Sequence, residues 1–394
     1  MKVLRVISSM NPENGGPCQG IRNSVPELSK LGVISEVVSL DAPDSSFLNK
    51  DSFPIRAIGP AKNAWCYNAQ LLPWLIKNLN KYDVVIVHGL WQYHGYAVYK
   101  AIKHLRKYGR QFPKYYVMPH GMLDPYFQKS SGRKLKALRN KIYWKYLESY
   151  VVNNADGLLF TCKAELLLAR ETFDPYKPKQ ELNVGYGIEV PPFYSDEMKH
   201  AFTQKWPLIV KTPFILFLSR IHPKKGVDIL IQAYLELIRC GMQLPFLMIA
   251  GPGLETDYGQ RLIRDLNKNS ELYNKIGFTG MLSGDEKWGA FYGCQAFILP
   301  SHQENFGIAV VEALACCKPV LITNQVNIWR EISETGGGLV EDDDLEGVKR
   351  LLTCWVNLSE VEQHLMGVNA EVSFKNYFLI KEASQKFYMA IKNN

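Results

Sequence analysis

No apolar run in this chain of 394 residues approaches the ~20 residues that a helix needs to span a bilayer; the longest have the length of strands. The sequence also lacks internal repeats and low-complexity tracts, and 47% of its residues are hydrophobic and 21% charged. This composition is typical of globular proteins and argues against a fibrous or disordered chain. Because 394 residues exceed one ordinary domain, we expect two domains of comparable size.

The eight cysteines show no C-x-x-C pairing, and several lie in apolar surroundings. We interpret them as free thiols, neither paired in disulfides nor bound to zinc. The N-terminus does not resemble a signal peptide, because Arg5 interrupts its apolar residues, which instead predict a first strand. We therefore expect a cytoplasmic protein.

The net charge is +8, and many basic residues concentrate in residues 129–145, where Lys129, Arg133, Lys134, Lys136, Arg139, Lys141 and Lys145 lie. The same segment carries Leu135, Leu138, Ile142, Tyr143, Trp144 and Tyr146 at helical spacing. A basic helix of this kind could rest on an anionic membrane, peripherally on the inner face of the plasma membrane, or contact an anionic acceptor. Alternatively, it is a solvated face over a core stripe. We expect no nucleic-acid partner, since no nucleic-acid-binding motif accompanies the charge.

Both halves of the chain alternate apolar strand-like runs with helical segments. Predicted strands cover residues 3–8, 35–40, 84–88, 114–117, 157–161, 214–219, 246–250 and 296–299, and a short strand with a turn is expected at 276–282. This alternation predicts an α/β fold with parallel sheets covered on both faces, which bind ligands at the carboxyl ends of their strands. A proline-rich linker at 191–193 predicts the boundary between domains 1–190 and 191–375.

One stretch of the second half combines a strand, a polar loop and a helix with two carboxylates. After the strand at 296–299, a helix is expected to begin near Phe306 or Gly307, with Glu304 in the loop and Glu312 about two turns into the helix. Free N–H groups at a helix N-terminus favour phosphate, and flanking carboxylates suit neutral hydroxyls. Such a group of ligands fits a nucleotide sugar, although a glutamate near a helix start can also serve only as a cap.

Two cations, Arg220 and Lys225, follow the strand at 214–219 and precede a helix. Fixed cations there could neutralise a leaving diphosphate, which otherwise needs a metal, although loop cations are often only solvated. Gly251 and Gly253 follow the next strand, but they lack the third glycine and the acidic partner of a dinucleotide fingerprint.

Other candidates carry weaker signals. Asp342 and Asp344 have the D-x-D spacing of metal-dependent transferases, but they lie in an acidic connection that we expect to be exposed, so no metal is predicted. In the first half, Gly15 and Gly16 allow close approach of a ligand to the backbone, or form an ordinary turn. Further loops contain Trp91 and Tyr93, which suit sugar rings or a core, and His120, which follows a strand and is either structural or ligand-binding.

With these parts in order, the sequence resembles the retaining glycosyltransferases of family 4, which have the GT-B fold of two facing Rossmann-like domains. The resemblance covers nearly the whole chain and is most specific for Leu218-Ser219-Arg220, Lys225-Gly226, the glycines at 251 and 253, Phe278-Thr279-Gly280, and Glu304 with Glu312. It implies that residues 376–394 form a C-terminal helix that crosses back to the N-terminal domain. It also implies an acceptor-binding N-terminal domain and a C-terminal domain that binds the nucleotide sugar.

The resemblance further implies roles for individual residues. The donor diphosphate should be held by Arg220, Lys225 and the backbone of Asn305, Phe306, Gly307 and Ile308. Glu304 and His120 should contact the sugar, Glu312 the ribose, and Met281 and Leu282 the base. The backbone at Gly16, Gly251 and Gly253 should approach the donor. The sequence departs from the family where Ser219 replaces the usual glycine before the phosphate-binding arginine. The glycine loop at residue 15 also lacks the lysine of glycogen and starch synthases, which argues against an ADP-glucose glucan synthase.

We therefore expect a retaining, metal-independent hexosyltransferase without a cofactor, which uses a UDP-sugar, with UDP-glucose preferred, in polysaccharide or glycolipid synthesis. Trp91 and Tyr93 are the candidates for acceptor binding. Two other enzyme classes remain open. A UDP-sugar 2-epimerase of GT-B fold would release free epimer without an acceptor, and an NAD-dependent oxidoreductase would bind NAD and ignore UDP. A sugar-binding protein without activity is a third alternative.

Overall fold

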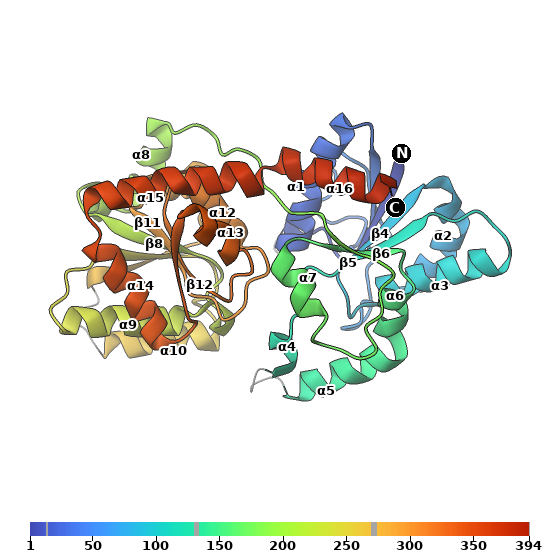
Figure 1. Ribbon diagram of the computed structural model, residues 1–394, viewed down its shortest axis with the longest axis horizontal. Helices are drawn as coiled ribbons and strands as arrows, with labels where there is room; N and C mark the ends of the chain where they lie inside the picture. Colours follow the sequence, from blue (N-terminus) through green and yellow to red (C-terminus); the bar gives the residue numbers. More distant parts are fainter. Residues whose placement is uncertain (13–14, 130–133, 269–273, 394) are drawn as a thin grey trace. The chain divides into compact units, whose positions relative to one another are not determined.

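The computed structural model describes residues 1–12, 15–129, 134–268 and 274–393, which form two compact units (Figure 1). The first unit contains Met1–Glu189 and the C-terminal segment from Ile380, and the second contains Val190–Leu379. Arg133 of the predicted basic segment lies outside the described residues. Within the described ranges, no helix combines the length and the apolar character that crossing a bilayer requires.

The N-terminal unit is an α/β layer structure around a parallel sheet with the strand order β3-β2-β1-β4-β5-β6-β7. The strands are β1 (Lys2–Ile7), β2 (Ile34–Ser39), β3 (Ile55–Ala57), β4 (Val84–His88), β5 (Lys114–Met118), β6 (Gly157–Phe160) and β7 (Glu181–Asn183). The helices are α1 (Gly16–Lys30), α2 (Leu71–Asn78), α3 (Tyr93–Lys107), α4 (Tyr126–Lys129), α5 (Lys134–Tyr143), α6 (Ser149–Asn153), α7 (Lys163–Ala169) and α16 (Ile380–Asn393).

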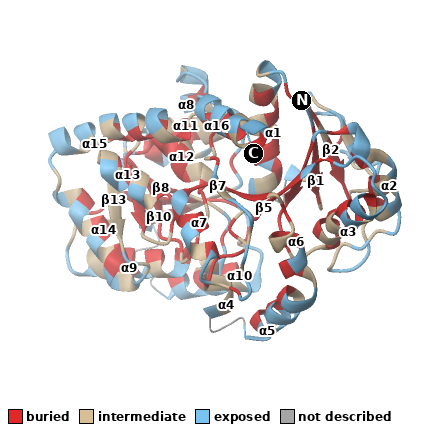
Figure 2. Ribbon diagram, turned by 45° about the vertical axis from the view of Figure 1, so that its right-hand side comes forward, coloured by how far each residue is buried: buried red, intermediate tan, exposed pale blue. Residues whose placement is uncertain are grey.

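The central strands of this sheet are buried on both faces because helices cover both (Figure 2). Successive side chains of a strand point to opposite faces. Leu4 and Val85 therefore pack with α2 and α3, whereas Val3 and Val84 pack with Phe387 of α16. The C-terminal helix α16 is thus part of the N-terminal unit, where it packs beside α1.

The second unit repeats this plan with the strand order β10-β9-β8-β11-β12-β13, again parallel. Its strands are β8 (Phe214–Leu218), β9 (Phe246–Ala250), β10 (Ile276–Gly280), β11 (Ala296–Leu299), β12 (Val320–Thr323) and β13 (Gly338–Glu341). Its helices are α8 (Asp196–Lys205), α9 (Val227–Arg239), α10 (Asp257–Asn267), α11 (Gly284–Gly293), α12 (Ile308–Ala315), α13 (Trp329–Thr335), α14 (Leu345–Asn357) and α15 (Glu360–Ser373).

The predicted alternation of strands and helices is confirmed in both units, and the predicted strands at 84–88 and 246–250 match β4 and β9. Three expectations differ from the structure. The predicted strands lack β3, β7, β12 and β13, and the last helix begins at Ile380 and not at residue 376, after a π-helical turn at Phe374–Phe378. The third difference concerns α5, where Leu135 and Leu138 are 85% and 58% exposed and so do not form the core stripe of the alternative interpretation.

Candidate functional site

The strand order of the C-terminal unit explains why two residues far apart in sequence meet. Strands β8 and β11 are neighbours, and the order of the sheet reverses between them. Ligands of such sheets bind beyond the carboxyl ends of the strands at this switch point. Lys225 follows β8 and Glu304 follows β11, and their side chains form a short ion pair.

The Lys225–Glu304 pair is tightly built. Lys225 is buried, and the following Gly226 has a φ of 66°, where an added Cβ would lie 2.0 Å from the carbonyl oxygen of Pro300. Glu304 is fixed by its backbone, which donates to the Gln325 carbonyl at 2.9 Å and accepts from the Asn327 N–H at 2.9 Å. Burial alone would raise the pKa of Glu304, but the charges of Lys225 and its neighbour Lys224 outweigh burial and hold that pKa below its usual value. The carboxylate of Glu304 is therefore ionised at neutral pH.

The helix that follows Glu304 begins with uncapped amides. Helix α12 starts at Ile308, one or two residues later than the expected start at Phe306 or Gly307, and its N-cap residue Gly307 has a φ of 76°. No side chain of the described residues caps this terminus. Phe306 is buried against Phe378, so it holds the loop in place through packing. The N–H of Asn305 donates to the carboxylate of Glu304 at 3.1 Å, so the uncapped helix start at Gly307 and Ile308 is the part of this segment that suits an anion.

The other two charged candidates of this unit differ in setting. Arg220 is exposed, and its guanidinium forms no hydrogen bond or ion pair with the described residues. Glu312 instead pairs with Lys287 of α11, with 2.9 Å between Nζ and Oε1. Burial raises the pKa of Glu312, and Lys287 offsets this only in part. The sequence did not indicate Lys287, because nothing in its local pattern points to a residue 25 positions away.

Backbone conformation and close packing require glycine at positions 251 and 253. Gly251 has a φ of 137°, and an added Cβ would lie 1.9 Å from the carbonyl oxygen of Ser219. For Gly253, with a φ of 118°, the same atom would lie 2.5 Å from the carbonyl oxygen of Ile221. Both glycines therefore let the loop after β9 pack against the loop after β8 that carries Arg220. Their predicted approach to a donor stays a prediction.

Four further positions of the C-terminal unit were named from the sequence. Met281 is 73% exposed and Leu282 is buried, both after the end of β10. Asp344 caps α14 by accepting from the Gly347 N–H at 2.7 Å, and Asp342 accepts from the side chain of Asn324 at 2.6 Å. Both aspartates thus have local structural partners.

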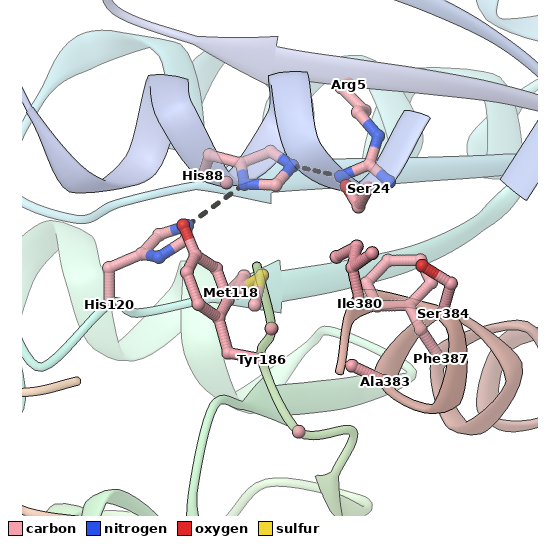
Figure 3. A pocket seen from close by; sticks show the side chains of 13 residues that line it. Arg5, Ser24, His88, Met118, His120, Tyr186, Ile380, Ala383, Ser384 and Phe387 are labelled. Carbon is pink, nitrogen blue, oxygen red and sulfur yellow. Dashed lines mark hydrogen bonds between the residues drawn. The ribbon is translucent and has the colours of Figure 1, made fainter. Parts of the chain in front are cut away.

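In the N-terminal unit, His120 is the end of a buried polar chain (Figure 3). Arg5 Nη1 lies 3.3 Å from His88 Nε2, and His88 Nδ1 lies 3.0 Å from His120 Nε2. A guanidinium only donates hydrogen bonds, so His88 must accept at Nε2 and donate from Nδ1. His120 then accepts at Nε2 and carries its proton on Nδ1. The chain thus fixes a neutral tautomer of His120 that can donate one hydrogen bond to a ligand.

Glu165 holds the loop in which His120 lies. Its carboxylate accepts from the Gly121 N–H and from both the N–H and the hydroxyl of Thr161, at 2.7 and 2.6 Å for Thr161. His120 has a φ of 53° and Gly121 one of 78°, so this turn needs such a support. The sequence did not indicate Glu165, which lies at the start of α7, beside β6.

The remaining candidates of the N-terminal unit are mostly packed. Tyr93 is buried against the ring of Trp65, with 5.1 Å between ring centroids. The backbone N–H of Trp91 donates to Glu148 at 3.0 Å, and the centroid of its ring lies 5.3 Å from that of Phe173. This packing accounts for both rings without an acceptor, and their acceptor-binding role stays a prediction. An added Cβ at Gly16 would meet nothing within 4 Å, so no steric contact requires that glycine.

The buried imidazoles of this unit predict acid sensitivity. Burial lowers the pKa of His94 to about 4 and that of His120 to about 3, and it lowers the pKa of His88 as well. Below the unfolded pKa of ~6.5 the unfolded chain binds protons that the folded chain does not, so stability falls as pH falls. Between pH 7.5 and 5.5 each imidazole should cost roughly 1 kcal/mol of unfolding free energy. His94→Asn should reduce this loss in urea titrations. The exposed control His364→Asn should leave it unchanged, and equal losses in both variants would contradict the assignment.

Comparison with known proteins shows what the C-terminal unit is similar to. Residues 198–367 match the family model described as Glycosyl transferases group 1, and the matched region includes the Lys225–Glu304 pair. The serotype-specific mannosyltransferase WbdA of Escherichia coli is 26% identical over 187 residues, 46% of this chain and 22% of that protein. The D-inositol 3-phosphate glycosyltransferase of Kineococcus radiotolerans is 25% identical over 197 residues, 48% and 45% of the two chains. The matched region thus spans less than half of either relative.

Solved structures resemble the chain over its full length. HepE of Anabaena, in complex with UDP and glucose, has a TM-score of 0.78 at 16% identity, with 100% of both chains covered. The sucrose-phosphate synthase of Thermosynechococcus elongatus has a TM-score of 0.75 at 16% identity, with 100% of this chain and 99% of that chain covered. At such identity the likeness establishes the fold. The expected GT-B class, with two Rossmann-like domains built on parallel sheets, is confirmed.

Proposed function

We propose that this protein is a retaining hexosyltransferase that moves a sugar from a nucleoside diphosphate to an acceptor hydroxyl without a metal ion. The observation that carries the proposal is the Lys225–Glu304 pair beside the uncapped N-terminus of α12, at the switch point of the C-terminal sheet. A cation and free amides suit a diphosphate, and an ionised carboxylate next to them suits sugar hydroxyls.

The charge that develops on the diphosphate defines the chemistry of the site. As the anomeric C–O bond breaks, Lys225, Arg220 and the amides of residues 306–308 stabilise the departing diphosphate. Arg220 is exposed, so its side chain can turn toward the diphosphate. Lys225 is held in place by Glu304 and interacts with both Glu304 and the diphosphate. The acceptor hydroxyl attacks from the face that the diphosphate leaves, and a diphosphate oxygen takes its proton. Glu304 positions the sugar and Glu312 the ribose, and neither needs to transfer a proton.

UDP is the donor nucleotide that we favour, and UDP-glucose the donor. Support comes from the resemblance to retaining glycosyltransferases and from HepE of Anabaena, a structural neighbour solved with UDP and with UDP-glucose. His120, as a neutral donor from Nδ1, can offer one hydrogen bond to a sugar hydroxyl. Polysaccharide or glycolipid synthesis in the cytoplasm would be the setting of the reaction.

Independence from metal ions is directly testable. The assay measures release of UDP from UDP-glucose, with a membrane extract as the source of acceptor. We expect the rate to be unchanged when EDTA is added in excess over trace metal ions. The reason is that Lys225 and Arg220 already supply the positive charge that a metal would bring. An absolute requirement for Mn²⁺ would contradict this and would direct attention to Asp342 and Asp344.

The helix α5 supports a peripheral position on an anionic membrane. Leu135, Leu138 and Ile142 follow one another at helical spacing and are all exposed, as are the lysines and the arginine around them. An exposed apolar stripe flanked by basic residues is the pattern of a helix that lies in a membrane interface. Binding of this kind gains about 1 kcal/mol per basic residue near anionic lipid.

Neutralising three of these charges should therefore weaken membrane binding by about 100-fold, since three charges at ~1 kcal/mol each correspond to about two orders of magnitude. The variant is Lys134→Gln/Lys136→Gln/Arg139→Gln, and the measurement is co-sedimentation with phosphatidylglycerol vesicles. The control neutralises three exposed lysines of α3 in the same unit, Lys100, Lys103 and Lys107. Equal binding by both triple variants would show that α5 is not the membrane-binding element.

A further inference from the structure

The N-terminal unit contains a buried cation that pairs with no carboxylate of the described residues. Arg5 lies in the middle of β1 and is 1% exposed. Its Nη1 contacts His88, and its guanidinium lies over the ring of Phe387 at 5.1 Å. The N–H groups of Nε and Nη2 have no hydrogen-bond partner among the described residues. Buried polar groups are almost always satisfied, so these two N–H groups indicate a missing ligand.

The cavity beside Arg5 has a second unpartnered polar atom. The residues that line it come from β1, α1, β4, β5, the loop around Tyr186, and α16 (Figure 3). Ser384 of α16 lines it too, and its buried hydroxyl has no partner within the described part of the chain. Donors from β1 and α16 thus line the same space, and the cavity volume of about 20 Å³ admits one particle the size of a water molecule.

The positive charge of Arg5 favours an anion over a water molecule in this cavity. Burial lowers the pKa of Arg5 to about 10, so the guanidinium still carries its charge at neutral pH. The described residues that line the cavity include the imidazoles of His88 and His120 and the phenol of Tyr186, but no carboxylate. The phenol, whose pKa is raised chiefly by burial, is neutral and donates to the Gly16 carbonyl at 2.8 Å. A water molecule would satisfy hydrogen bonds but would leave the buried charge uncompensated, which is costly.

We propose that this cavity is a binding site for a monatomic anion of the chloride class, held by Nε and Nη2 of Arg5 and by the hydroxyl of Ser384. The small volume of the cavity favours a monatomic anion over phosphate and other polyatomic anions. The bound anion links α16 to β1 and fixes the side chain of Arg5, which in turn fixes His88. This inference does not require the proposed function to be correct.

Bromide provides a direct probe. Crystals of the full chain, grown with sodium bromide in place of chloride, should show an anomalous difference peak in the cavity within contact distance of Arg5 and Ser384. In Ser384→Ala the anomalous peak should disappear or be much weaker, because the ion has lost one of its ligands. Density without anomalous signal at this position in the wild type would identify a water and would overturn the proposal.

Thermal unfolding provides the solution test. At a chloride concentration ten times the dissociation constant, the ratio of folded to unfolded protein should rise about eleven-fold over a buffer of equal ionic strength made with sodium gluconate. Arg5→Met should abolish the response, whereas the exposed control Arg170→Met, which removes a pair with Glu181, should retain it. A response of equal size in wild type and Arg5→Met would contradict the site. If Arg5→Met does not fold, Ser384→Ala and the wild-type bromide crystals decide the question.

Discussion

Replacing Lys225 with methionine is expected to lower kcat/KM for sugar transfer by about 10²–10³-fold, the usual effect of losing one preorganised group that stabilises transition-state charge. Lys225 is buried, pairs with Glu304 and lies at the switch point of the C-terminal sheet. The measurement is UDP release from UDP-glucose with a membrane extract as the source of acceptor.

The variant should also lose about 1–3 kcal/mol of stability, because the carboxylate of Glu304 stays largely buried without its cation. The double variant Lys225→Met/Glu304→Gln removes that unpaired charge and should regain stability without regaining activity. Lys205→Met removes an exposed lysine that pairs with Glu286, and it should change neither quantity. Full activity of Lys225→Met would remove the basis for the assigned role.

Gly251→Ala should destabilise the C-terminal unit by about 3 kcal/mol or more, through strain at positive φ and a clash with the backbone. The new methyl group would lie 1.9 Å from the carbonyl oxygen of Ser219, so the loop before Arg220 would have to move. UDP affinity should fall with it. Thermal unfolding and UDP titration provide the two measurements.

Gly280 is a matched control for this prediction. It ends the neighbouring strand β10 and also has a positive φ, 69°, but an added Cβ there would meet nothing within 4 Å. Gly280→Ala should therefore cost only the ~1–2 kcal/mol of the backbone conformation. If Gly251→Ala is no worse than Gly280→Ala, the close approach of the two loops does not explain the glycine.

The parts of the fold that depend on local pattern could be predicted from the sequence. The buried strands read as short apolar runs, and the alternation with helices implied parallel sheets. The helix start after Glu304 was misplaced by only one or two residues, because uncapped helix ends have weak signals. The edge strand β3 was missed because it is three residues long and lies in a proline-rich region.

Side-chain partners from distant parts of the chain could not be predicted in this way. Lys225 and Glu304 were both named, but their ion pair follows from the order of strands in the sheet and not from any spacing. Lys287, the partner of Glu312, gave no signal at all. Arg5 did give one, because a charge within a buried parallel strand needs partners, but the sequence could not show that they are His88 and a cavity.

The central claim is that the C-terminal unit binds a nucleoside diphosphate through Lys225. Calorimetric titration of UDP into the wild type and into Lys225→Met, in EDTA and with NAD⁺ in parallel, tests it most directly. We expect one-to-one binding of UDP to the wild type, at least tenfold weaker binding to the variant and no binding of NAD⁺. Tighter binding of GDP or ADP would change only the preferred base. Binding of NAD⁺ without binding of UDP, GDP or ADP would contradict the account.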